Sequence, residues 1–89
     1  MHAVYLLVGV DDKKFYVGLA SDLRRRLHEH RTGKVRSTHE RGMVKLVYFE
    51  AFANKQDARR REQYLKTTKG RNGLRLILRE TLAHLARQP

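Results

Sequence analysis

The 89 residues suffice for one small domain with one modest hydrophobic core, which we expect to span residues 1–89. Lys and Arg number 20 against 9 Asp and Glu, and the formal net charge of +11 indicates a polyanionic partner, with nucleic acid ranked before an acidic membrane surface. The chain contains no cysteine, which excludes disulfide frameworks and thiolate zinc sites. Its longest apolar run, AVYLLVGV, is too short for a bilayer and lacks signal-peptide features, so we expect a cytoplasmic protein without a membrane partner.

Two predicted strands open the chain. The segment from Ala3 to Val10 is rich in β-branched and aromatic residues, and the composition is similar from Phe15 to Leu19. Between them, DDKK supplies typical turn residues, and Asp11 and Asp12 are expected to serve the turn. The pattern therefore predicts an antiparallel hairpin.

A helix and a third strand follow the hairpin. Ser21 is the predicted N-cap of a helix that runs through Arg31, and Gly33 is expected to end it in a left-handed conformation. The run VKLVYFEAF, Val44 to Phe52, has the composition of a strand, and its Glu50 is expected to pair with a nearby cation.

Two more helices are predicted in the rest of the chain. Asn54 caps the first of these, Asp57 occupies a capping-box position, and Gly70 ends it. From Gly73 the leucines and the isoleucine recur at helical spacing, which predicts one last helix over nearly the whole tail. The predicted order is ββαβαα, an α/β fold of the segregated α+β kind.

The three consecutive arginines of the first helix point in different directions. Measured from Leu23 at about 100° per residue, His30 lies at about −20° and Arg26 at about −60°, so both border the core-facing side. Arg24 and Arg25 point elsewhere. Arg26 therefore either meets a partner or an anion, or packs its stem on the core while its head reaches water.

Glu62 lies on the apolar side of the second helix. Measured from Ala58, Leu65 falls near about −20° and Glu62 near about +40°. A carboxylate in that position is costly unless it is paired, hydrogen-bonded or bound to a cation. A buried salt bridge to Arg26 and a surface pair with Lys66 at i+4 are the alternatives to a metal ligand.

Five sequence blocks, in order, carry a resemblance to a known family. VYLL and FYVG hold the places of two signature elements, and SDLRRRLHEHRTGKV, KLVYFEAF and ARRREQYLKTTKGR follow. From Ala3 to about Leu78 the chain resembles the GIY-YIG nuclease family in its compact stand-alone form, similar to the N-terminal domain of the excinuclease C subunit. One departure is Ala3, where a glycine is common, and this is a mild change.

The resemblance implies a small three-stranded antiparallel sheet flanked by helices, and it assigns roles to five residues. Tyr5 and Tyr16 match the signature tyrosines, although each is also compatible with an ordinary strand aromatic. Glu62 matches the metal-binding glutamate and would anchor one Mg²⁺ or Mn²⁺ ion, which keeps several waters. Arg26 would grip a phosphate oxygen through two hydrogen bonds, and Tyr5 would assist proton removal from water. Tyr16 would orient phosphate or water, and His30 would support Tyr5 or shuttle a proton.

Further residues are assigned to nucleic-acid binding. Some members of the family carry an asparagine after the glutamate, for which Asn72 is the candidate, with the N-cap of a helix as its alternative role. The basic residues expected to contact the nucleic acid are Arg24, Arg25, Lys34, Arg36, Lys66, Lys69 and Arg71.

The function expected from these observations is metal-dependent endonucleolytic hydrolysis of DNA phosphodiester bonds, as in DNA repair, with low sequence specificity. The sequence leaves open which DNA structure is cut and whether RNA is a substrate. The alternatives are a catalytically weak nucleic-acid-binding module and a basic structural protein of a ribonucleoprotein. Neither has a use for the inward carboxylate of Glu62.

Overall fold

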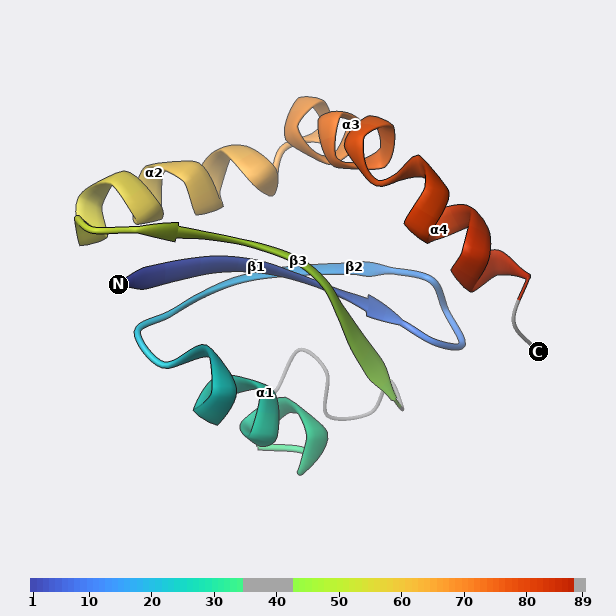
Figure 1. The fold of residues 1–89 in the computed structure, drawn as a ribbon, viewed down its shortest axis with the longest axis horizontal. Helices are drawn as coiled ribbons and strands as arrows, with labels where there is room; N and C mark the ends of the chain where they lie inside the picture. The colour runs from blue at the N-terminus through green and yellow to red at the C-terminus, as the bar shows by residue number, and fades with distance from the viewer. Residues whose placement is uncertain (35–42, 88–89) are drawn as a thin grey trace.

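The computed structural model describes residues 1–34 and 43–87 and shows helices on both faces of a small sheet (Figure 1). The elements in chain order are β1 (His2–Gly9), β2 (Phe15–Ala20), α1 (Leu23–Arg31), β3 (Val44–Phe52), α2 (Lys55–Leu65), α3 (Thr68–Ile77) and α4 (Arg79–Ala86). No helix within these two ranges is long and apolar enough to cross a membrane.

The three strands form an antiparallel sheet in the order β2-β1-β3, which confirms the predicted fold class. In the centre of the sheet, Tyr5 of β1 lies opposite Gly18 of β2 on one side and opposite Phe49 of β3 on the other. A register shift between Leu6 and Leu7 interrupts the pairing of β1 with β3. Strand β2 is therefore one edge of the sheet and β3 is the other.

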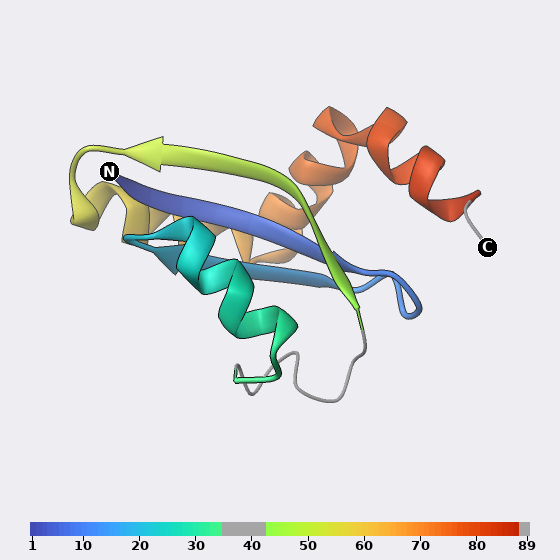
Figure 2. The same cartoon turned by 60° about the horizontal axis from the view of Figure 1, so that its bottom comes forward.

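Two hydrophobic clusters cover the two faces of the central strand. Val4, Leu6 and Val8 point to the face covered by α2, α3 and α4, while Tyr5 and Leu7 point to the face covered by α1 (Figures 1 and 2). Successive side chains of a strand point to opposite faces of the sheet, and here helices cover both faces. This explains why every residue from Ala3 to Val8 is buried.

Helix α1 begins one residue later than predicted. Asp22, and not Ser21, is the N-cap, and its Oδ1 accepts a hydrogen bond of 3.1 Å from the backbone N of Arg25. Both residue types are good caps, so composition alone does not choose between them. The predicted end is confirmed, because Gly33 has φ +77° and follows the C-cap Thr32.

Helix α2 begins as predicted but ends earlier. The side chain of Asn54 accepts a hydrogen bond from Gln56 N at 2.8 Å, which confirms the N-cap. Gly70 does not end this helix; α2 stops at Leu65, and Thr67 caps α3, accepting from Gly70 N at 3.1 Å. Asp57 occupies the first turn of α2, where its charge faces the helix dipole favourably.

Gly70 instead allows α3 to pack closely against the end of α2. A Cβ on this residue would lie 2.1 Å from the carbonyl oxygen of Tyr64 and 2.7 Å from the Cα of Leu65, both backbone atoms. The absence of a side chain at Gly70 is therefore a packing requirement.

The last predicted helix is divided in two. It begins at Thr68 and not at Gly73, and Leu78, with φ −112° and ψ 20°, separates α3 from α4. Both helices keep leucines on the same core, so the helical spacing of the leucines continues across the break. The N-cap role considered for Asn72 is wrong, because this residue lies inside α3.

Candidate active site

A pocket of about 200 Å³ opens at the β2 edge of the sheet, where α1 and α2 approach from opposite faces. Its wall contains all five residues predicted to be catalytic. The lining residues are Tyr5, Tyr16, Val17, Gly18, Leu19, Arg26, His30, Glu62 and Lys66.

The hydroxyl of Tyr5 lies between a histidine and an arginine of α1. Tyr5 is only 2% exposed, and its oxygen is 2.9 Å from Nε2 of His30 and 3.4 Å from Nε of Arg26, which donates to it. The rings of Tyr5 and His30 meet edge to face at 5.8 Å between centroids. Gly18 makes this placement possible, because a Cβ there would lie 2.3 Å from the Tyr5 oxygen.

Burial acts on both members of this pair in the direction of neutrality. It raises the pKa of Tyr5 above its ordinary value, against the hydrogen bond and charge of Arg26, which lower it. Burial also lowers the pKa of His30, and the positive charge of Arg26 lowers it further. At neutral pH the site therefore holds a neutral phenol beside a neutral imidazole.

Arg26 lies on the pocket wall, while its two neighbours in sequence do not. Its guanidinium donates to Tyr5 from Nε and to Oε1 of Glu29 from Nη1 at 3.2 Å, and these hydrogen bonds raise its pKa. Arg24 is exposed, and Arg25, with a side chain 79% exposed, does not line the pocket that contains Tyr5. The helical spacing thus separated Arg26 correctly from the other two.

Among the residues that the structure describes, Glu62 is the only carboxylate in the pocket wall. Its side chain is 18% exposed, and its Oε2 lies 3.2 Å from Nζ of Lys66, the i+4 pair considered from the sequence. The alternative pair with Arg26 is not formed. Within residues 1–34 and 43–87 no group of three or more His, Asp or Glu side chains gathers as a metal cage. One carboxylate beside phenolic oxygens, in a pocket with room for water, fits Mg²⁺, which takes most of its ligands from water and phosphate.

Tyr16 is held by the turn of the hairpin. Its hydroxyl donates to Oδ2 of Asp12 at 2.9 Å, and Oδ1 of the same carboxylate accepts from Lys14 N at 2.9 Å. The turn role of Asp12 is thus confirmed. Its second role was missed, although the separation of four residues across a tight turn places it within reach of Tyr16.

Some of the predicted nucleic-acid-binding residues lie outside the pocket. Asn72 is exposed on α3, accepts from Nη1 of Arg75 at 3.0 Å and does not line the pocket. Lys66 is part of the wall. Lys34, Lys69 and Arg71 do not line the pocket, and Arg36 lies outside the described residues.

An ion pair on the other flank of α2 fixes the helix to the sheet. Nε and Nη2 of Arg61 donate to the two oxygens of Glu50 at 2.8 and 2.9 Å, and Tyr48 donates to the same carboxylate. The hydrogen bonds from Arg61 hold the pKa of Glu50 below its ordinary value. The predicted pairing of Glu50 with a cation is confirmed, and this pair links α2 to β3 one residue before Glu62, which lines the pocket.

Comparisons with known proteins show the family to which this chain belongs. The family model described as the GIY-YIG catalytic domain matches residues 1–75. A UPF0213 protein of Clostridium perfringens is 41% identical over 78 residues, which cover 86% of this chain and 83% of the relative. Another, from Streptococcus pneumoniae serotype 4, is 40% identical over 70 residues, 76% of this chain and 71% of the relative. The solution NMR structure of a UPF0213 protein from Bacillus halodurans is 33% identical, with a TM-score of 0.54, covering 85% of this chain and 83% of that one. The chain therefore belongs to the GIY-YIG family, a family of nucleases that act on nucleic acid.

Proposed function

We infer that the protein is a metal-dependent endonuclease that hydrolyses DNA phosphodiester bonds with low sequence specificity. The observation that carries this inference is the convergence of Tyr5, Arg26, His30 and Glu62, from three different elements, on one pocket. Phosphodiester hydrolysis needs a positioned nucleophile, a route for its proton and stabilisation of charge on the phosphate oxygens. The pocket offers a group for each task.

The proton route runs through the Tyr5–His30 pair. A phenol whose pKa is raised by burial is a poor base alone, because burial disfavours the phenolate. With Nε2 of the neutral His30 2.9 Å away, Tyr5 passes its own proton to the imidazole as it accepts one from water. The pair, and not the phenol alone, is the base in this proposal.

Arg26 and the ion held by Glu62 would stabilise the negative charge on the phosphate. Arg26 keeps its charge throughout, because its pKa is raised by Tyr5 and Glu29. Glu62 would hold one Mg²⁺ or Mn²⁺ ion, and such an ion supplies Lewis-acid stabilisation of phosphate charge when it is bound. Tyr16, fixed by Asp12, orients phosphate or water at the mouth of the pocket.

The competing function is a catalytically weak nucleic-acid-binding module. One observation favours it: Lys66 already compensates the charge of Glu62, as an ordinary i,i+4 pair on a helix would. A binding module needs no more than that pair. The two functions differ in whether the carboxylate is required for a chemical step.

The test is a panel of labelled DNA and RNA, each as duplex, branched, nicked and single-stranded forms, incubated with Mg²⁺, with Mn²⁺ or with a chelator. We expect cleavage of at least one DNA form that the chelator stops, and we expect Glu62→Gln to abolish cleavage while binding is retained. Cleavage by Glu62→Gln at the wild-type rate would exclude Glu62 as the ion's anchor. Binding without cleavage throughout the panel would establish the binding module instead.

A further inference from the structure

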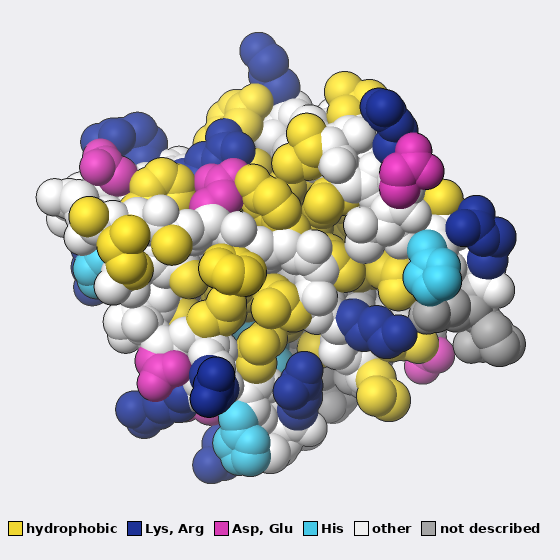
Figure 3. Space-filling view, viewed as in Figure 1, with side chains coloured by type: hydrophobic (Ala, Val, Ile, Leu, Met, Phe, Trp, Pro, Cys, Tyr) yellow, Lys and Arg dark blue, Asp and Glu magenta, His cyan; other side chains and the backbone are white. Residues whose placement is uncertain are grey.

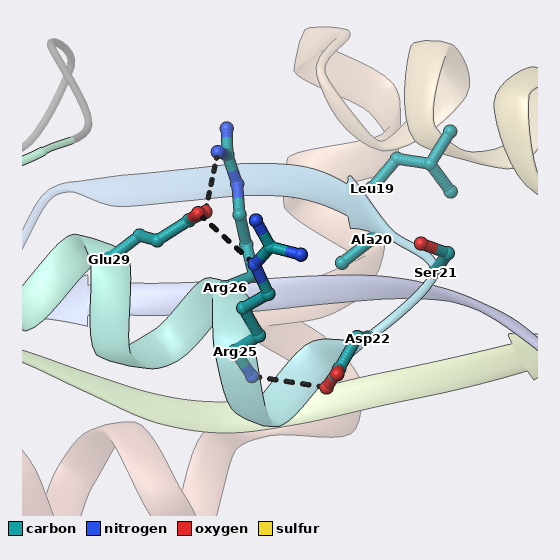
Figure 4. A pocket seen from close by; sticks show the side chains of 7 residues that line it. All are labelled: Leu19, Ala20, Ser21, Asp22, Arg25, Arg26 and Glu29. Carbon is teal, nitrogen blue, oxygen red and sulfur yellow. Dashed lines mark hydrogen bonds and ion pairs between the residues drawn. The ribbon is translucent and has the colours of Figure 1, made fainter.

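Glu29 joins two of the three consecutive arginines of α1. Its Oε1 accepts from Nη1 of Arg26 at 3.2 Å, and its Oε2 lies 3.7 Å from Nε of Arg25 (Figure 4). Glu29 lines a neighbouring pocket of about 260 Å³ and is absent from the wall of the candidate active site. Arg26 and Leu19 line both pockets, and Arg26 is the residue of the candidate active site to which Glu29 is hydrogen-bonded. The charge of Glu29 also acts at a distance on Tyr5 and His30, where it works to raise the pKa of each.

The guanidinium of Arg26 is held at two of its three nitrogens. Nε donates to the hydroxyl of Tyr5 at 3.4 Å and Nη1 donates to Glu29 at 3.2 Å. Nη2 has no hydrogen-bond partner within the part of the chain that the structure describes. A planar group fixed at two points keeps one orientation, so its remaining N–H bonds are presented in one direction.

We propose that Glu29 is a positioning residue that holds the Arg26 guanidinium in the orientation in which it receives the reacting phosphate. This proposal rests on the proposed function for the identity of the anion. A free arginine side chain has several rotatable bonds to order when it meets phosphate, whereas one already held by Glu29 and Tyr5 has lost that freedom beforehand. The stabilising charge then needs no reorganisation during the reaction.

Glu29 promotes the chemical step, but it weakens the protein's affinity for nucleic acid. Its negative charge lies beside Arg25 and Arg26 and reduces the positive potential there. Removing it therefore strengthens or preserves binding to a polyanion while it slows the chemical step. If Glu29 only stabilised the helix through its i,i+3 and i,i+4 pairs, its removal would lower the free energy of unfolding. It would not slow cleavage while preserving the affinity for nucleic acid.

The first experiment measures single-turnover cleavage at saturating enzyme, together with the dissociation constant, for Glu29→Ala. We expect the rate constant to fall roughly tenfold, because Arg26 is no longer held in the orientation that stabilises the phosphate charge. The dissociation constant should be equal to or smaller than that of the wild type. Glu29→Gln keeps an oxygen acceptor for Nη1 and should recover most of the rate. This split between rate and affinity is a result that a purely structural role does not produce.

Asp57 supplies the matched control. Its Oδ1 lies 3.2 Å from Nη1 of Arg60, the same i,i+3 spacing and the same distance as in the pair of Glu29 with Arg26, but on a part of α2 away from the candidate active site. Asp57→Ala should change the affinity in the same direction as Glu29→Ala and leave the single-turnover rate unchanged. Three results would overturn the proposal. The rate of Glu29→Ala could equal that of the wild type, or Asp57→Ala could lose as much rate as Glu29→Ala. The rate loss in Glu29→Ala could also be accompanied by a lower melting temperature that accounts for it.

A second measurement is independent of cleavage. In NMR spectra of the free protein, the Nε–H signal of Arg26, identified by its absence in Arg26→Lys, should be protected from exchange with water and should lose that protection in Glu29→Ala. An Arg26 signal unaffected by Glu29→Ala would overturn the positioning role whatever the enzyme assay gives. If the wild type cleaves nothing, the proposed function fails, and this signal still decides whether Glu29 orders Arg26.

Discussion

The proton on Tyr5 is subject to two opposing influences. Arg26 donates to the phenolic oxygen and so favours the phenolate, while burial disfavours it, and burial is the larger effect because the pKa of Tyr5 is raised. The proton therefore stays on Tyr5 until a neighbour can take it. Because His30 lies 2.9 Å away with its pKa lowered, a neutral acceptor is available at physiological pH.

Substitution of the arginines distinguishes the residue in the pocket from its neighbours. Arg26→Ala should lower single-turnover cleavage by roughly 10²-fold, the scale of losing one preorganised charge-stabilising group, and Arg26→Lys should recover little because an ammonium lacks the planar two-point grip. Arg24→Ala and Arg25→Ala should mainly weaken binding. Similar small losses in all three alanine variants would mean that the arginines form only a basic surface.

The environment of His30 predicts a measurable pKa. Because burial and the charge of Arg26 both lower it, the pKa of His30 in an NMR titration should lie below 6.5, and Arg26→Gln should raise the pKa part of the way back. As pH falls through the ordinary histidine range, the unfolded chain takes up a proton that folded His30 refuses, so this group lowers stability there. A His30 pKa at or above 6.5 in the wild type would contradict the neutral proton acceptor.

Lys66 should compete with a metal ion for Glu62. Since Nζ of Lys66 lies 3.2 Å from Oε2 of Glu62 in the pocket wall, an ion that binds Glu62 must replace this partner. Lys66→Met should therefore increase the affinity for Mn²⁺, measured by calorimetry without substrate, whereas Glu62→Gln should remove the site. A weaker Mn²⁺ affinity in Lys66→Met would show that Lys66 supports the site and does not compete for it.

At the scale of elements, local signals were sufficient to locate the strands, the end of α1 and the start of α2, and they placed the start of α1 within one residue. Turn residues, caps and a glycine with positive φ act within a few residues, so the sequence displays them directly. The break between α3 and α4 was not predictable in this way, because the leucine spacing continues across Leu78. The early end of α2 depends on contact between Gly70 and the backbone of Tyr64, which is a tertiary effect.

The same distinction holds for the candidate site. The 3.6-residue period placed Arg26, His30 and Glu62 on inward faces correctly, because a helix face follows from spacing alone. Glu29 and Asp12 were missed as parts of the site, because an i+3 acid and a turn aspartate look like ordinary helix and turn stabilisers. Only their contacts with Arg26 and Tyr16 identify the additional role.

Two glycines of α3 give opposite predictions for one substitution. Gly70→Ala would place Cβ 2.1 Å from the carbonyl oxygen of Tyr64 and should destabilise the fold by about 3 kcal/mol, because backbone must move. Gly73→Ala meets nothing within 4 Å and should stabilise the fold by about 0.5–1 kcal/mol through helix propensity. Urea denaturation measures both. Equal free energies of unfolding for the two variants would contradict the close contact of α3 with α2.

At the scale of the whole molecule, internal ion pairs cannot compensate the basic excess. With 20 Lys and Arg against 9 Asp and Glu, 11 cations have no carboxylate of their own. On the face seen in Figure 3, Lys and Arg stand apart around the rim, and hydrophobic side chains gather in the middle, over β3 and toward α3. On this face the positive charge is distributed and not collected in one patch, so we expect the net charge of +11, and not a patch on this face, to attract a polyanion at long range.

The salt dependence of binding tests this distributed charge. Each phosphate contact releases condensed counterions, so the affinity for a DNA duplex should fall by roughly 10³-fold or more between 50 and 200 mM salt if about six to ten contacts form. Lys69→Ala and Arg24→Ala, which remove cations outside the candidate pocket, should each lower the slope of log affinity against log salt by about 1 and leave cleavage of bound substrate unchanged. Glu62→Gln, which removes no cation, should keep the wild-type slope. An affinity that stays constant with salt would exclude nucleic acid as the partner. A protein with 11 uncompensated positive charges that binds phosphates must release counterions, and its affinity must then fall as salt rises.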